Sequence, residues 1–160
     1  MDNDLEEHKT KILSIVKETV RETFLSYFNL TCEEVEKLRA EEPNAEKITC
    51  ETKIHNTKSE CVVAVTIEEN ILEKISQIVY PPDIAKTKQA YESCVLEVAN
   101  IVGMKVKTYL NENGFELKAS IPTVSKVIKT EHDDIFISFS IEEEYLHVDI
   151  KLNLFEAVAA

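Results

Sequence analysis

The sequence predicts an α+β fold, a two-layer sandwich in which long helices cover one face of a mostly antiparallel sheet. Segments with helical spacing of apolar residues and segments of alternating apolar and polar residues follow one another in blocks: helix, two strands, helix, helix, three strands. Such blocks favour antiparallel pairing, because parallel sheets are built from strict strand–helix alternation. Each predicted strand has one apolar and one polar face, which indicates helices on a single side of the sheet.

The chain has 160 residues, enough for one domain that buries about two-thirds of the surface of its unfolded chain. We therefore expect a single domain over residues 1–160. Its first element is an amphipathic helix from Leu5 to Phe28, preceded by acidic residues that suit a helix start. Residues 31–34, TCEE, have the form of a capping box and predict a short polar helix that Pro43 ends. We interpret residues 31–43 as a charged insert on the surface.

Two alternating segments follow, at residues 48–54 and 61–67, with residues 56–59 as the turn of a hairpin. Helical spacing returns at residues 68–80 and ends at Pro81-Pro82. A long central helix then follows, for which we expect Asp83 as the cap, Asn113 as the last residue and Gly114 as the left-handed terminus.

The rest of the chain alternates again. Apolar residues occupy every second position in three segments, at residues 115–121, 135–141 and 146–154. Turns are expected between the last three segments, at residues 129–134 and 142–144.

Charge and composition exclude several classes of function. Thirty acidic side chains against 18 basic ones give a net charge of −12, with no lysine or arginine cluster and no tryptophan. Nucleic acids and anionic membranes are therefore unsuitable partners. No apolar run approaches the roughly 20 residues that span a bilayer, and the acidic N-terminus does not resemble a secretory signal. We expect a cytoplasmic protein.

Cysteine and histidine spacing does not indicate a metal site. The four cysteines have no C-x-x-C spacing, so buried reduced thiols are expected. His132 lies beside Asp133 and Asp134, and we interpret this group as a polar hairpin tip. No metal site of the protein's own is predicted.

Glycine is rare, and its position in the central helix is informative. The chain has two glycines, and Gly103 lies in the middle of the predicted central helix. A glycine there costs roughly 1 kcal/mol relative to alanine. We expect it where a side chain would not fit.

The central helix separates two faces, because each residue advances about 100° around the axis. The face expected against the sheet comprises Val95, Ala99, Val102, Gly103, Val106 and Leu110. The opposite face comprises Ser93, Glu97, Asn100, Met104 and Thr108. Glu97 and Asn100 are neighbours across one turn, and Ile101 and Met104 flank them with apolar atoms. This arrangement suits a docking surface, although the two polar residues can equally be solvated residues of an amphipathic helix.

A family resemblance bears on this choice. Residues 96–105, LEVANIVGMK, followed by Leu110, Asn113-Gly114-Phe115 and Ile121-Pro122-Thr123-Val124, resemble the signature of the CheX-like chemotaxis phosphatases, relatives of CheC. That family has an E-x-x-N helix with a nearby glycine, followed by a strand that ends near a P-x-V element. The order of elements is similar over most of the chain.

The resemblance implies a phosphatase that hydrolyses the aspartyl phosphate of a CheY-type response-regulator receiver. By that resemblance Asn100 would orient the attacking water, and Glu97 would pair with the receiver's lysine. Ser93, which shares the helix face, and Ile101 and Met104, which flank the pair, are expected to contact the partner. By the resemblance, the Mg²⁺ ion would belong to the receiver. The family also implies a homodimer. This chain would carry one such pair, since its first helix has Arg21 where a second amide would stand.

Two other functions stay open at the level of sequence. One is a non-catalytic signalling module that binds a receiver through the same helix face. The other is a dimerisation domain in which Glu97 and Asn100 have no role. Docking and water positioning use overlapping residues, so the sequence does not separate catalysis from binding.

Overall fold

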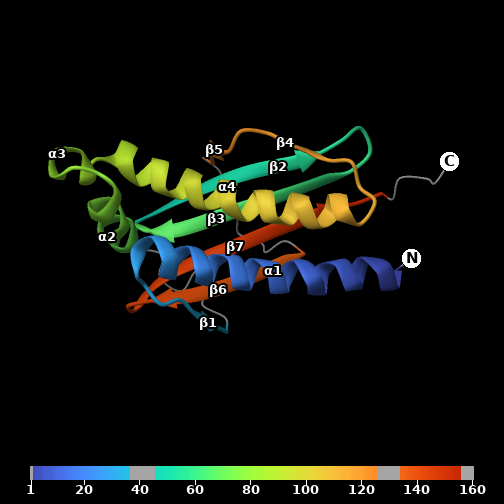
Figure 1. Ribbon diagram of the computed structural model, residues 1–160, viewed down its shortest axis with the longest axis horizontal. Coiled ribbons are helices and arrows are strands. Elements are labelled where there is room, and N and C mark those ends of the chain that lie inside the picture. The colour runs from blue at the N-terminus through green and yellow to red at the C-terminus, as the bar shows by residue number, and fades with distance from the viewer. Residues whose placement is uncertain (1, 37–45, 126–133, 156–160) are drawn as a thin grey trace.

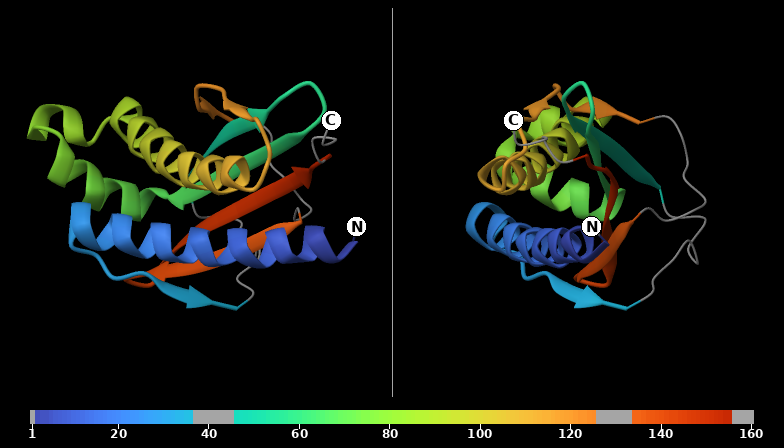
Figure 2. Two further views of the ribbon diagram at one scale, coloured as in Figure 1. Left: turned by 45° about the vertical axis from the view of Figure 1, so that its right-hand side comes forward. Right: turned by 90° about the vertical axis from the view of Figure 1, so that its right-hand side faces the viewer.

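The computed structural model describes residues 2–36, 46–125 and 134–155, which form two layers (Figure 1). Two long helices, α1 (Asp2–Phe28) and α4 (Lys88–Glu112), pack against each other and cover one face of a sheet. Figure 2 shows the same arrangement end-on, with both helices on one side of the strands. The predicted α+β sandwich is confirmed.

The sheet contains seven described strands, and every pairing is antiparallel. They are β1 (Glu33–Val35), β2 (Lys47–His55), β3 (Glu60–Glu68), β4 (Lys118–Ala119), β5 (Thr123–Val124), β6 (Ile135–Ile141) and β7 (Glu144–Asn153). Their order is β1-β6-β7-β3-β2-β4, and β5 also pairs with β2. β2 therefore has β3 on one side and the two short strands on the other.

The hairpins form where the sequence predicts them. Asn56 accepts hydrogen bonds from the backbone N–H groups of Lys58 (2.8 Å) and Ser59 (2.7 Å), which closes the β2–β3 turn. Glu142 and Glu143, with φ of 47° and 72°, form the two-residue β6–β7 turn. Both residues lie in the left-handed region that such hairpin turns require. The other expected turn, at residues 129–134, lies outside the described residues except for Asp134.

The expected helix at residues 31–43 is wrong where the structure describes it. Residues 33–35 form strand β1, whose register places Glu34 opposite Phe139 of β6. The capping-box pattern is a local signal, and here the edge of the sheet offers backbone partners that outweigh it. The remainder of that expected helix, residues 37–45, lies outside the described part of the chain.

The expected start of the central helix also needs correction. The predicted helix at residues 68–80 forms as α2 (Glu69–Val79), but Pro82 then opens a separate turn, α3 (Pro82–Ala85). Proline suits a first helical position, because its fixed φ fits the helix and its missing N–H is not needed there. Asp83 therefore lies in α3, and Thr87 caps α4 by accepting a 3.2 Å hydrogen bond from the Ala90 N–H.

The predicted strand at residues 115–121 forms only in part. Two residues, Lys118 and Ala119, pair with β2, and Thr123 and Val124 pair with it again further along. Phe115 and Leu117 are buried as expected, but Ile121 is 86% exposed instead of facing the core. Pro122 explains the break, because proline cannot donate to a ladder and interrupts strands.

The core lies between the helices and the sheet. Phe24 from α1, Leu110 from α4 and Phe139 from β6 are among its fully buried side chains. All four cysteines are buried and free, which confirms the expectation of reduced thiols. α4 ends as predicted, with Gly114 at φ 94° just beyond it. Within the described ranges, no helix combines the length and the apolar character that crossing a bilayer requires.

Candidate functional site

The site is organised by the close approach of α4 to β2. A Cβ atom added at Gly103 would lie 3.1 Å from Cγ2 and 3.2 Å from Cβ of Thr52, inside ordinary carbon–carbon contact of about 3.5–4.0 Å. The Thr52 hydroxyl also donates a 3.4 Å hydrogen bond to the Ala99 carbonyl one turn earlier. Glycine at position 103 therefore lets the helix rest on the strand, as the sequence predicts.

The two faces of α4 are divided as expected. Every residue assigned to the sheet side is buried: Val95, Ala99, Val102, Gly103, Val106 and Leu110. Every residue assigned to the opposite side is exposed: Ser93, Glu97, Asn100, Met104 and Thr108. The buried face fixes the rotation of the helix, and this rotation places the Glu97–Asn100 turn outward.

Glu97 and Asn100 are accessible to another molecule. Both side chains are exposed, and they are separated by one helical turn, so they project in similar directions. Neither forms a hydrogen bond or an ion pair with any residue in the described part of the chain. Their carboxylate and amide groups are free to bind a partner.

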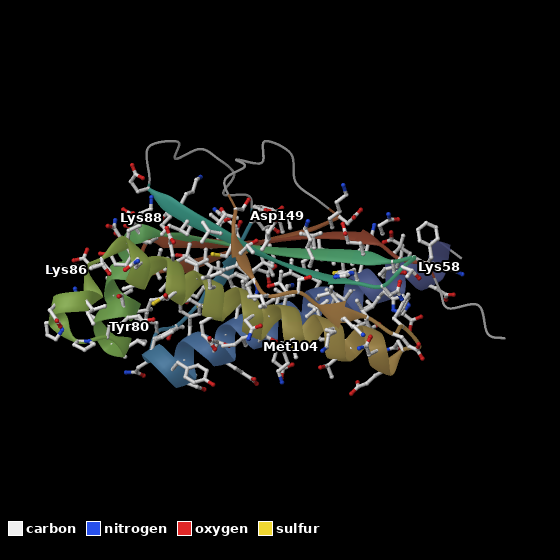
Figure 3. All side chains as sticks on the ribbon, turned by 90° about the horizontal axis from the view of Figure 1, so that it is seen from above. Lys58, Tyr80, Lys86, Lys88, Met104 and Asp149 are labelled. Carbon is white, nitrogen blue, oxygen red and sulfur yellow. The ribbon has the colours of Figure 1, made fainter. Side chains whose placement is uncertain are left out.

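A groove of about 540 Å³ lies beside this pair and is open to solvent. One wall is α4, and the other is the segment between β4 and β5. Its lining residues are Ser93, Leu96, Glu97, Asn100, Met104, Lys107, Ala119, Ser120, Ile121 and Pro122. In Figure 3, where Met104 is labelled, α4 and the β4–β5 segment lie next to each other when viewed from above.

Both walls of the groove are supported by the same strand. The Ser120 N–H donates to the Lys53 carbonyl (2.8 Å) and the Ser125 N–H donates to the Thr49 carbonyl (2.8 Å). β2 thus holds the β4–β5 segment at two points, and it also carries Thr52, on which α4 rests. Both walls of the groove are therefore anchored to β2.

Four of the five site residues predicted from sequence line the groove: Ser93, Glu97, Asn100 and Met104. The fifth, Ile101, is half-buried and does not line it. One residue after Asn100, Ile101 is rotated about 100° around the helix, away from the β4–β5 segment. The roles proposed for these residues stay predictions.

Six of the ten residues that line the groove were not predicted from the sequence. Leu96 and Lys107 on α4, and the second wall at residues 119–122, were not predicted as site residues. The second wall was overlooked because its alternating pattern was interpreted as a continuous strand. The signal that indicates otherwise is Pro122, since a proline inside an apparent strand points to an edge or a break.

The groove offers chemistry for binding and positioning. It contains one carboxylate (Glu97), one amide (Asn100), one ammonium group (Lys107) and two serine hydroxyls. Burial raises the pKa of the nearby strand's Cys50 thiol to about 12, and the Glu92 carboxylate adds to this shift, so no reactive thiolate is present there at neutral pH. In the described ranges, no three His, Cys, Asp or Glu side chains are grouped so that they could hold a metal ion.

Comparison with known proteins defines the class of fold. No family model and no curated protein matches the chain. Solved structures do match over about nine-tenths of it, and they include chemotaxis proteins named CheX or CheC-like. The chain has a CheX-like fold.

Three of these structures illustrate the similarity. CheX from Vibrio vulnificus is 15% identical, with a TM-score of 0.71 over 91% of this chain and 98% of its own. CheX from Desulfovibrio desulfuricans is 16% identical, with a TM-score of 0.68 over 89% and 99%. CheX from Borrelia burgdorferi, solved in a complex with CheY, BeF3 and Mg²⁺, is 14% identical, with a TM-score of 0.63 over 92% and 97%.

Proposed function

We propose that this protein is a phosphatase that hydrolyses the aspartyl phosphate of a CheY-type receiver domain. The observation that supports the proposal is the exposed Glu97–Asn100 pair, free of intramolecular partners in the described chain and set beside an open groove. The CheX-like fold adds support, since one protein of this fold has been crystallised with CheY and BeF3.

Asn100 is the proposed catalytic residue. Phosphoryl transfer requires little covalent chemistry and depends mainly on positioning and charge stabilisation. An amide can accept a hydrogen bond from a water molecule through its oxygen and donate one through its nitrogen, so it can hold that water in line with the phosphorus. It brings no negative charge towards the phosphoryl oxygens, which a carboxylate in the same place would do.

Glu97 is the proposed anchor. It lies one turn before Asn100, so its carboxylate can pair with the receiver's lysine while Asn100 reaches the phosphoryl group. The Mg²⁺ ion that neutralises the developing charge belongs to the receiver, and this protein supplies no cofactor of its own in the proposed reaction. We further propose that the protein acts in the cytoplasm as a homodimer, which analytical ultracentrifugation tests.

The direct experiment measures phosphate release from CheY-type receivers of the same organism, each phosphorylated with acetyl phosphate in the presence of Mg²⁺. Wild type is expected to accelerate release from at least one receiver. Asn100→Ala is expected to lower kcat by about 100-fold, the scale on which loss of positioning acts. Glu97→Ala is expected mainly to raise KM, by about tenfold or more, because it leaves the receiver's lysine without its counter-charge.

Glu112→Ala is the matched control, because Glu112 is an exposed carboxylate on α4 that lies outside the Glu97–Asn100 face and does not line the groove. It should behave as wild type. Unchanged hydrolysis by Asn100→Ala would show that the catalytic assignment is wrong. If wild type binds a receiver loaded with BeF3 and Mg²⁺ but does not accelerate hydrolysis, the protein is the non-catalytic receiver-binding module instead. Loss of folding in either variant would indicate a structural role for the pair.

A further inference from the structure

Ile121 is an unusual residue for an exposed position. Its side chain is 86% exposed, more than any other large apolar side chain in the described part of the chain. It lies on the wall of the groove opposite α4. Hydrogen bonds of Ser120 and Ser125 to β2 fix the segment on both sides of it, and Pro122 restricts the backbone next to it. An exposed apolar side chain on a segment anchored by backbone hydrogen bonds suits an interface anchor, because binding would bury it.

Lys107 gives the groove a second charge. It lies ten residues after Glu97 on the same helix, so a rise of 1.5 Å per residue separates the two positions by about 15 Å along the axis. Lys107 is half-buried, and it forms no ion pair with any residue in the ranges described. The groove is therefore acidic at the Glu97 end and basic at the Lys107 end, with Asn100 and Met104 between them.

We propose that Ile121 and Lys107 determine which receiver this protein recognises. Ile121 enters an apolar depression on the receiver, and Lys107 pairs with a receiver carboxylate distinct from the site of the lysine that Glu97 binds. This inference rests on the proposed function. The receiver surface must accordingly present a cation opposite Glu97, an anion opposite Lys107, and an apolar depression opposite the β4–β5 segment that carries Ile121.

The charge pattern favours a receiver over a second copy of this chain. The chain has a net charge of −12, and the acidic end of the groove needs a cation opposite it. A second copy would bring a mainly acidic surface to Glu97, which is unfavourable. A receiver that presents its active-site lysine meets this requirement. Self-association through the groove is the alternative outcome of the test.

The first test replaces the anchor. Ile121→Ser is compared with Ile78→Ser, a matched control on α2 that is 55% exposed and outside the groove. With the phosphorylated receiver that wild type dephosphorylates best, Ile121→Ser should raise KM by about tenfold and change kcat by less than about twofold, since a hot-spot residue contributes to binding and not to the chemical step. The Kd for the same receiver loaded with BeF3 and Mg²⁺ should rise by the same factor. Ile78→Ser should leave both values unchanged.

The second test reverses the charge. Lys107→Glu is compared with Lys105→Glu, which makes the same change at an exposed position of α4 outside the groove. Lys107→Glu should raise KM by about tenfold at low salt and by less at high salt, because the pair is electrostatic. Lys105→Glu should raise KM much less. Circular dichroism of each variant shows whether the fold is retained.

The outcomes separate this inference from the function on which it rests. If Asn100→Ala loses activity but Ile121→Ser and Lys107→Glu keep the KM and Kd of wild type, the proposed function stands and this inference is overturned. If wild type neither binds nor dephosphorylates any receiver, both are overturned. If Ile121→Ser instead converts a dimer to a monomer in ultracentrifugation, the groove joins two copies of the chain and the inference is wrong.

Discussion

Gly103→Ala tests the contact that sets the position of the site. Alanine favours a helix over glycine by about 1 kcal/mol, so the substitution should stabilise an unconstrained helix by that amount. Here the new methyl group would lie 3.1 Å from Thr52 Cγ2 and 3.2 Å from Thr52 Cβ. The Cβ atom is bonded directly to the β2 backbone, so a change of side-chain rotamer does not move it.

Two opposing contributions decide the sign of the effect. Overpacking of this kind costs about 1–3 kcal/mol, against a gain of about 1 kcal/mol in helix propensity. We expect a net destabilisation of about 1 kcal/mol in the free energy of unfolding. The helix should also shift away from β2 by a few tenths of an ångström, and Asn100, which lies in the same turn, should shift with it. A loss of about three- to tenfold in kcat is expected.

Urea denaturation measures the change in the free energy of unfolding, and phosphate release from the phosphorylated receiver measures the change in kcat. The Thr108→Gly and Thr108→Ala pair on the exposed side of α4 gives the helix-propensity difference without any contact to the sheet. In a Thr52→Ala background, which removes the Cγ2 contact, Gly103→Ala should be less destabilising. If Gly103→Ala stabilises wild type by the full propensity difference, α4 is not pressed against β2 and the reasoning is refuted.

Three further predictions concern stability. Thr52→Val should lower the free energy of unfolding by about 0.5 kcal/mol, because the hydrogen bond that it removes is long (3.4 Å) and the Ala99 carbonyl keeps its helical partner. A decrease above about 2 kcal/mol in urea denaturation would contradict this. Burial raises the pKa of the Cys32, Cys50 and Cys61 thiols from 9.0 to about 12, and that of the Cys94 thiol to about 11. All four thiols should therefore resist alkylation in the native state, and rapid labelling of the native protein would disprove their burial. The free energy of unfolding should fall as the pH rises above 9, because only the thiols of the unfolded chain ionise there. The protonated Glu68 carboxyl donates a hydrogen bond to the Glu144 carboxylate, and the Asn70 amide donates a second at 3.0 Å; both lower the pKa of Glu144 from 4.5. The stabilisation by Glu144 should be present above pH 4.5 and lost as the pH falls through the lowered pKa. A Glu144→Gln variant should therefore lose less stability on acidification, and equal pH profiles would argue against the contact.

The sequence predicted the elements whose signals are strong and local. The helical spacing of α1 and α4 and the alternation of β2, β3, β6 and β7 each extend over seven residues or more, and these elements form as predicted except at the start of α4, where Thr87 replaces Asp83 as the cap. The separation of the two faces of α4 was predicted for the same reason. One buried stripe fixes the helix rotation, and this rotation exposes Glu97 and Asn100.

Short segments were predicted less well, because their neighbours decide their structure. Residues 33–35 carry a helix-start signal, but they lie where β6 offers an open edge, and they become a strand. Residues 115–121 alternate as a strand does, but the pairing with β2 is interrupted between Ala119 and Thr123, and Ile121 lies in solvent. Propensity over a few residues amounts to only a small energy, and tertiary contacts outweigh it.

The sequence by itself determined the fold class, the outward direction of the Glu97–Asn100 turn and the need for a residue without a side chain at position 103. The fold class follows from the order of helical and alternating segments, the outward direction from the periodicity of α4, and the glycine requirement from the cost of glycine inside a helix. Only the tertiary structure decided that the β4–β5 segment faces α4 across a groove, and that Ile121 and Lys107 line it with the predicted pair. That juxtaposition depends on β2, which binds the segment through backbone hydrogen bonds. Such bonds use the main chain that all residues share, so they leave no pattern in the sequence.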